Sequence, residues 1–147
     1  MIAVVQRVLS AGVFVDDPPY AESILQGFCV LLGVEEDDGI EDATWMAKKL
    51  TNLRIFDDQE GKMNRSILDT QGELLLISQF TLIANCSQGN RPSFIKAAKP
   101  DVAKPLVDEV GNLLRQRGVP VKCGVFGSKM RVEIENDGPT TIILKQD

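Results

Sequence analysis

Histidine is absent from this chain of 147 residues. Without an imidazole side chain, a protein has no Ser-His-Asp triad, no Cys-His pair and no histidine-ligated metal. Any reaction must then use hydroxyl groups, backbone N–H groups or groups of the substrate itself. The missing residue type therefore excludes most familiar hydrolase mechanisms.

Cysteine is scarce, and the three that occur, Cys29, Cys86 and Cys123, form no C-x-x-C pair. An odd number without that spacing predicts neither a disulfide framework nor a zinc site, so we expect all three thiols to be reduced. Cys29 lies in an apolar run and is interpreted as a core residue. Cys86 has no base partner, which disfavours a catalytic role for it.

Long hydrophobic runs are also missing. No apolar run reaches the roughly 18 residues of a membrane-spanning helix, and residues 1–7 lack the basic start of a secretory signal. We therefore predict a cytoplasmic protein with no membrane partner. The net charge of -5, from 16 basic and 21 acidic residues, argues against a nonspecific nucleic-acid coat protein. No DNA partner is predicted, although this charge does not exclude a local basic patch.

What remains is the composition of an ordinary folded protein, with 44% hydrophobic and 25% charged residues. The length allows one well-buried core but is too short for two domains that each bury a core of their own. We predict a single domain over residues 1–147.

Hydrophobic periodicity predicts an α/β fold with a mixed sheet. The expected strands cover residues 2–8, 12–15, 22–24, 28–34, 73–82, 129–135 and 140–144. One helix is predicted from the stripe of Ala43, Met46, Ala47, Leu50 and Leu53. A second helix is predicted from Leu106, Val107, Val110, Leu113 and Leu114, with Pro105 in its first turn, Gly111 packed closely on a neighbour and Gly118 as its stop. The order of these elements indicates a mixed sheet layered with two helices.

Two acidic segments could be metal sites, but an ordinary helix start and an ordinary turn also explain their acidic residues. Residues 35–38 come directly before the first predicted helix, where a helix N-terminus favours negative charge. Residues 57–61 lack the alternating acids and closing glutamate of a calcium loop, and a turn between strands is favoured. We expect no metal and no cofactor.

Two short motifs are the candidates for chemistry. The first is Ser78-Gln79-Phe80-Thr81-Leu82, where polar residues end a predicted buried strand. Taken alone, it is also explained by an ordinary strand whose hydroxyls bond to neighbouring backbone. The second, Asn136-Asp137-Gly138-Pro139, is also explained by a trans Gly-Pro turn between strands.

Together with other segments, these motifs resemble one family, the D-aminoacyl-tRNA deacylases, which remove D-amino acids from tRNA. The resemblance runs nearly end to end, through residues 3–8, 30–34, 52–56, 61–64, 78–82, 91–94 and 136–139. It implies a three-layer, barrel-like arrangement of mixed β-sheets with two helices on one side. It also implies an editing esterase that releases the D-amino acid and the tRNA.

The resemblance implies roles for the first motif. Ser78, Gln79, Phe80 and Thr81 would bind the 3′-terminal adenosine and the aminoacyl ester. The backbone N–H groups of Phe80 and Thr81 would stabilise the oxyanion that develops on the ester carbonyl. Thr81 would mainly position the substrate, and the 2′-hydroxyl of the terminal ribose would position or activate water.

For the second motif, the resemblance implies selectivity across a homodimer. The Gly138-Pro139 peptide bond would be cis and would reach into the active site of the partner subunit, with Asn136 as part of the same motif. Rejection of L side chains by rigid main chain would not reject glycine, so Gly-tRNA(Ala) is also an expected substrate.

For RNA contact, the sequence offers Lys129 and Arg131 on one strand face, and Arg91. Residues 85–90 lack at least two positive charges that many members of the family carry there. Two alternatives remain open: a non-catalytic tRNA-binding or replication-associated module on the same fold, and an editor with relaxed chirality.

Overall fold

A long, bent strand, β1 (Ile2–Val15), is the centre of the molecule, and the computed structural model describes all residues from 1 to 147. Strand β1 pairs antiparallel with β3 (Gly27–Gly33) along its first half and with β2 (Tyr20–Ile24) along its second half. It also pairs antiparallel with β8 (Arg131–Lys145) along most of its length. The two strands predicted at residues 2–8 and 12–15 are therefore one strand.

The remaining strands extend this sheet and add a small second one. Strand β6 (Glu73–Ser78) pairs parallel with β3, and β7 (Val121–Cys123) pairs parallel with β6. Strands β4 (Phe56–Asp57) and β5 (Met63–Arg65) form a separate hairpin. The six-stranded sheet is thus mixed, as predicted from the order of the elements.

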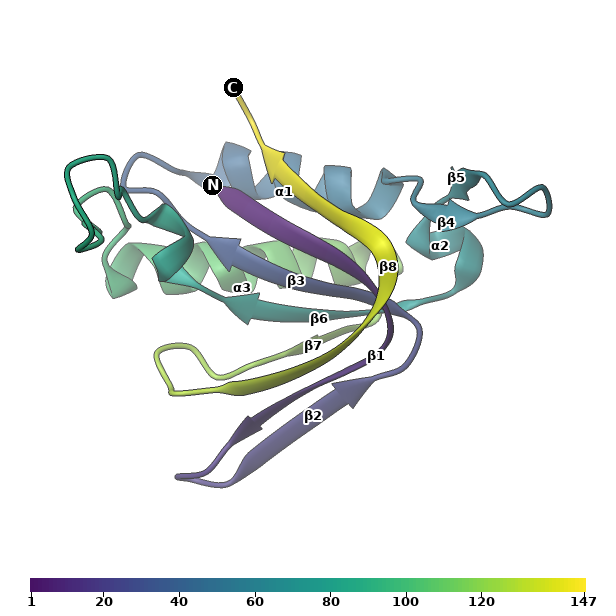
Figure 1. The fold of residues 1–147 in the computed structure, drawn as a ribbon, viewed down its shortest axis with the longest axis horizontal. Helices are drawn as coiled ribbons and strands as arrows, with labels where there is room; N and C mark the ends of the chain where they lie inside the picture. The colour runs from purple at the N-terminus through teal and green to yellow at the C-terminus, as the bar shows by residue number, and fades with distance from the viewer.

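The sheet is strongly curled (Figure 1), and its end strands β2 and β7 contact each other. The Tyr20 hydroxyl donates to the Cys123 carbonyl at 2.7 Å, and the Lys122 ammonium donates to the Ser23 carbonyl at 2.8 Å. Inside the curl lies a small apolar cluster that contains Cys29, whose burial raises its pKa to about 12. The barrel-like α/β fold is therefore confirmed, and Cys29 is a core residue as predicted.

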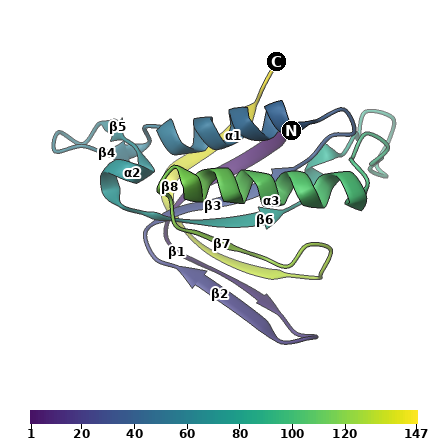
Figure 2. The ribbon, with the colours of Figure 1, turned by 180° about the vertical axis from the view of Figure 1, so that it is seen from behind.

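Helices α1 (Ile40–Asn52) and α3 (Pro100–Gln116) cover one face of the sheet (Figure 2). The larger core cluster lies between this face and the helices. A third, short helix, α2 (Ile67–Thr70), was not predicted; Ser66 caps it by accepting a hydrogen bond from the Asp69 N–H. None of these helices has the length and apolar character needed to cross a membrane.

The acidic segments form turns. In the first segment, which ends two residues before α1 begins, Asp38 accepts a hydrogen bond of 2.7 Å from the Glu35 N–H. Asp58 accepts bonds from the N–H groups of Glu60 and Lys62, and the bond from Lys62 is the main cause of its lowered pKa. Both segments thus lie where the predicted helix start and the predicted turn place them.

Three predicted boundaries are wrong. The strand expected over residues 73–82 ends at Ser78, and Phe80–Ile83 form a single turn of 3₁₀ helix, η1. The first-turn proline of α3 is Pro100, and Pro105 lies inside the helix, so the helix begins a turn earlier than predicted. Gly138 and Pro139 do not form a turn between strands, because β8 continues through them.

Within β8, the Gly-Pro segment forms a bulge. Gln6 pairs with Thr141 and Val8 pairs with Asn136, so residues 137–140 stand opposite Arg7 alone. Extra residues that have no partner in the ladder must leave the plane of the sheet. Gly138 and Pro139 are accordingly exposed, and the peptide bond between them is cis, as is that between Asp17 and Pro18.

Gly111 packs less tightly than predicted. A Cβ atom at this buried position in α3 would lie 3.6 Å from Leu76 Cδ2, an ordinary contact distance. Alanine fits there and is the better helix former, so we expect Gly111→Ala to raise the free energy of unfolding by about 0.5–1 kcal/mol. Urea denaturation measures this change, and a loss of stability would show that Leu76 cannot accommodate the methyl group.

Candidate active site

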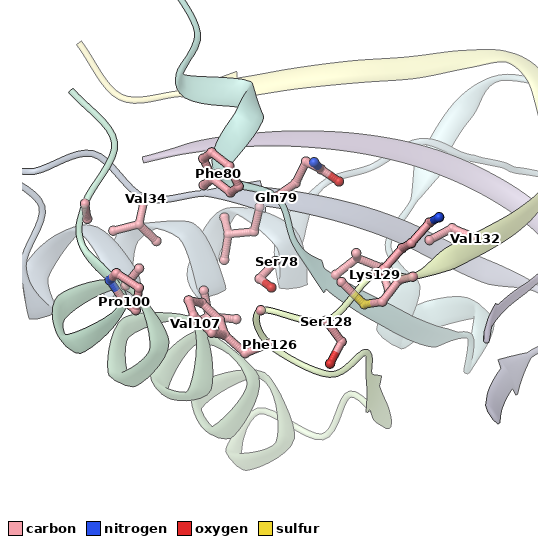
Figure 3. Close-up of a pocket in the computed structure, with 16 residues that line it drawn as sticks. Val34, Ser78, Gln79, Phe80, Pro100, Val107, Phe126, Ser128, Lys129 and Val132 are labelled. Carbon is pink, nitrogen blue, oxygen red and sulfur yellow. The ribbon is translucent and has the colours of Figure 1, made fainter. Parts of the chain in front are cut away.

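A cavity of about 540 Å³ opens at the carboxyl end of β6. It lies between that strand end, the start of α3 and the segment that leads into β8 (Figure 3). The lining residues are Leu32, Val34, Ile77, Ser78, Gln79, Phe80, Ala98, Pro100, Ala103, Val107, Phe126, Gly127, Ser128, Lys129, Met130 and Val132. Most of these side chains are apolar, and Lys129 is the only ionisable one.

The sheet places Ser78 at the cavity. Strands β3 and β6 are parallel, so their carboxyl ends meet at one edge, and the ladder between them stops at the pair of Leu32 and Ser78. The Gln79 N–H still donates to the Leu32 carbonyl at 2.8 Å before the chain turns into η1. Gly33 allows this turn, because a Cβ atom there would lie only 3.0 Å from the Gln79 carbonyl oxygen.

The turn after β6 leaves two backbone donors without acceptors. In η1, the first hydrogen bond runs from the Leu82 N–H to the Gln79 carbonyl. The N–H groups of Phe80 and Thr81 come before it and donate to no backbone or side-chain acceptor in the chain. Two adjacent free N–H groups at the rim of a cavity can bind an oxygen that carries negative charge.

The side chains around these donors have different positions. The Gln79 amide donates to the Thr81 hydroxyl, and Thr81 is exposed and outside the cavity lining. The Phe80 ring is 58% exposed and packs edge-to-face on Phe94, with 5.3 Å between the ring centroids. Ser78, Gln79 and Phe80 thus line the cavity, whereas Thr81 is the next residue along the chain and does not line it.

Asn136, Gly138 and Pro139 do not line this cavity. Asn136 pairs with Val8, which pairs with Gly27 at the start of β3, whereas Ser78 pairs near the end of β3. Five residues of strand separate these two ends, roughly 16 Å at 3.3 Å per residue. Figure 1 agrees, because β8 bends on the side of α2 while β6 points to the opposite side.

Two residues hold the Gly-Pro bulge in place. Asn136 Nδ2 donates to the carbonyl of Arg7, opposite the bulge, at 3.0 Å and to that of Thr140, the last residue of the bulge, at 3.1 Å. Arg7 is only 6% exposed, and its Nε lies 3.1 Å from Asp137 Oδ2. Sequence reasoning missed the role of Arg7. It could have been recognised as a charged residue within an otherwise mostly apolar predicted strand.

The basic residues predicted to contact RNA lie in three different environments. Lys129 lines the cavity. Arg131 lies in an adjoining groove with its guanidinium 4.5 Å from the centre of the Phe14 ring. Arg91 is exposed in the loop before Ser93, whose backbone forms two hydrogen bonds with Asn85. The structure therefore brings Lys129 to Ser78 and Gln79, but not Arg91.

Sequence reasoning also missed one wall of the cavity. Phe126, Ser128 and Met130 form it, after a turn in which Gly127 has a φ of 77°. That glycine was the available signal, since it marks a tight turn directly before Lys129. Pro100 and Val107 of α3 form the facing wall (Figure 3).

Comparison with known proteins agrees with these features. Residues 4–145 match the family model described as D-Tyr-tRNA(Tyr) deacylase. The chain belongs to this family. The D-aminoacyl-tRNA deacylase of Fervidobacterium nodosum is 51% identical over 98% of this chain and 96% of its own length. That of Parabacteroides distasonis is 49% identical with the same coverage. The prediction of a hydrolase of the deacylase class is thereby confirmed.

Solved structures share the fold of this family member. One described as c-Myc DNA Unwinding Element Binding Protein has a TM-score of 0.91 and 40% identity, and covers 100% of this chain and 99% of its own. Another, described as a probable eukaryotic D-amino acid tRNA deacylase, has a TM-score of 0.84 at 15% identity and covers 97% of each chain. The second likeness shows the fold alone.

Proposed function

We propose that this deacylase hydrolyses the ester bond between a D-amino acid and the 3′-terminal adenosine of tRNA. The observation that carries the proposal is the pair of free N–H groups, on Phe80 and Thr81, beside a cavity without any acid or histidine. We further propose that residues 1–147 act as one domain in the cytoplasm, where aminoacyl-tRNA is found.

The cavity fits a nucleoside. Its volume of about 540 Å³ and its mostly apolar lining suit an adenine ring, and Ser78 and Ser128 offer hydroxyls to the base or the ribose. Single-stranded RNA ends are recognised in this way, by apolar contact with the base and a few polar contacts. The ester would then lie at the rim, beside Phe80 and Thr81.

The chemistry follows from the free donors. As water attacks the ester, the carbonyl oxygen gains negative charge, which the N–H groups of Phe80 and Thr81 would stabilise by about 3 kcal/mol each. Because the lining holds no histidine and no carboxylate, the water would be positioned by the substrate's own 2′-hydroxyl.

Chiral selectivity is proposed to come from a second copy of the chain. Gly138 and Pro139 are exposed on a bulge far from their own chain's cavity. In a two-fold homodimer each bulge would enter the partner's cavity and leave no space for an L side chain. A relaxed-chirality editor is disfavoured because Asn136 and Arg7 hold this bulge rigidly.

Parallel deacylation of D-Tyr-tRNA, L-Tyr-tRNA and Gly-tRNA(Ala), with EDTA present, tests this function. We expect the D-tyrosyl and glycyl esters to be cleaved and the L-tyrosyl ester to be spared. The main chain of the bulge would clash with an L side chain, whereas glycine has no side chain to clash. Cleavage of the L ester at a similar rate would contradict the selectivity, and an uncleaved glycyl ester would contradict its proposed origin.

The second candidate function is a nucleic-acid-binding module without activity. One of the structures similar to this chain is named as a DNA-binding protein. We favour the enzyme, because a binding module would need neither free N–H groups beside Ser78 nor a braced Gly-Pro bulge. Binding of tRNA without cleavage of any ester would favour the module instead.

The loop over residues 85–90 affects tRNA affinity in this proposal. The loop carries no charged side chain. Each phosphate contact made by a cation changes the salt slope of binding by about 0.7–0.9. We expect Asn85→Lys with Asn90→Arg to tighten binding of tRNA and to steepen its salt dependence, measured by filter binding at several salt concentrations. Equal slopes would show that the loop does not touch phosphate.

A further inference from the structure

A second groove, of about 410 Å³, borders the active-site cavity. The two spaces share Ser128, Lys129 and Met130 as a common wall. An RNA strand that leaves the cavity over the exposed Lys129 would therefore meet this groove next. Its other lining residues are Phe14, Val15, Asp16, Asp17 and Arg131.

The groove combines three kinds of recognition group. Arg131 stacks its guanidinium on Phe14 and is paired with Glu133, and its side chain stays 63% exposed. Asp16 and Asp17 are exposed carboxylates in the turn after β1 and form no ion pair. Lys129 is exposed and likewise has no ion-pair partner.

We propose that this groove binds the nucleotide that precedes the terminal adenosine, and that its charges select cytidine. This inference rests on the proposed function, since the adenosine must first occupy the cavity. Lys129, at the junction of the two spaces, would contact the phosphate that links the nucleotides.

Cytidine is favoured over the other pyrimidine by the carboxylates. The amino group of cytosine is a hydrogen-bond donor that Asp16 or Asp17 accepts, whereas uracil presents a carbonyl oxygen at the same position and is repelled. The base itself would stack on the exposed face of the Arg131 guanidinium, as bases of single-stranded RNA do on arginine planes. Transfer RNA ends in C-C-A, so this groove would read the second-to-last base.

Short esters test the groove without the rest of the tRNA. The substrates are the 3′-D-tyrosyl esters of adenosine, of cytidylyl-adenosine and of uridylyl-adenosine, with D-Tyr-tRNA as reference. For the unmodified protein we expect kcat/KM for the cytidylyl ester to exceed that for the adenosine ester by about tenfold. We expect kcat/KM for the uridylyl ester to exceed that for the adenosine ester only slightly.

Variants separate the contributions. Arg131→Ala should lower the kcat/KM for the cytidylyl ester until it is close to that for the adenosine ester. The double variant Asp16→Asn, Asp17→Asn should remove the preference for cytidine over uridine, because an amide can also donate to uracil. Arg117→Ala, at the far end of α3, is the charge-matched control and should keep both ratios.

The outcomes distinguish this inference from the proposed function. If D-Tyr-tRNA or the adenosine ester is cleaved but the cytidylyl ester is no better a substrate than the adenosine ester, the groove proposal is overturned and the deacylase remains. If neither D-Tyr-tRNA nor any short ester is cleaved, the proposed function fails and the groove proposal fails with it.

Discussion

Replacing Gly138 with alanine is expected to reduce the hydrolysis of D-Tyr-tRNA by about a hundredfold and to leave the stability of the chain unchanged. Within its own chain, a Cβ atom at Gly138 would meet only Asn136 Oδ1, at 3.5 Å, which is an ordinary contact. In the proposed dimer, the same methyl group would press on the substrate in the partner's cavity. A displacement of about 1 Å at a reacting centre is enough for a loss of that size.

Stability and activity must be measured on the same preparation. Thermal unfolding and sedimentation should show a folded dimer for Gly138→Ala, and single-turnover deacylation should show the loss. A variant that is fully active would mean that Gly138 does not approach the substrate from either subunit.

Mixed dimers show which subunit supplies the motif. One chain carries Gly138→Ala with an intact cavity, and the other carries Ala103→Phe, which fills the cavity but keeps Gly138. Random exchange should restore about a quarter of the activity, since half of the dimers would then have one working site. If each Gly138 served its own cavity, the mixture would stay inactive.

The regular parts of this fold could be predicted because local pattern determines them. The apolar stripe from Ala43 to Leu50 has the spacing of one helix face, and α1 forms there with those residues buried. The predicted strand extended past Ser78, where the observed strand ends, and the reason for this error is non-local. Leu82 continues an apolar pattern, but the ladder with β3 ends at Leu32, which the pattern of residues 73–82 cannot indicate.

The candidate site was only partly predictable for a similar reason. The free N–H groups of Phe80 and Thr81 depend on the turn after β6, and that turn depends on the close approach of Gly33. The wall that contains Phe126 comes from a segment more than 40 residues away in the sequence, and the curl of the sheet brings it to Ser78. Contacts of this kind are set by topology rather than by periodicity.

Arg7 is the clearest residue of this non-local kind, and its replacement by methionine should affect both stability and selectivity. Its Nη1 donates to the buried carbonyl of Ile55 at 2.6 Å, and its Nε donates to the Asp137 carbonyl at 3.3 Å. Removing these bonds leaves polar groups without partners. We expect the free energy of unfolding to fall by about 2–3 kcal/mol.

Selectivity is the measurement that separates a positioning role from a merely structural one. Because Arg7 holds Asp137 beside the Gly-Pro bulge, its loss should let the bulge move, so that L-Tyr-tRNA becomes a substrate while D-Tyr-tRNA is cleaved more slowly. Arg7→Lys should recover little, since an ammonium cannot reach Ile55 and Asp137 together. Asp57→Asn is the matched control, because it weakens only the 3.3 Å contact of Arg7 with a carboxylate that is 55% exposed. A destabilised Arg7→Met variant that keeps the ratio of D to L hydrolysis would show that Arg7 supports the fold without positioning the bulge.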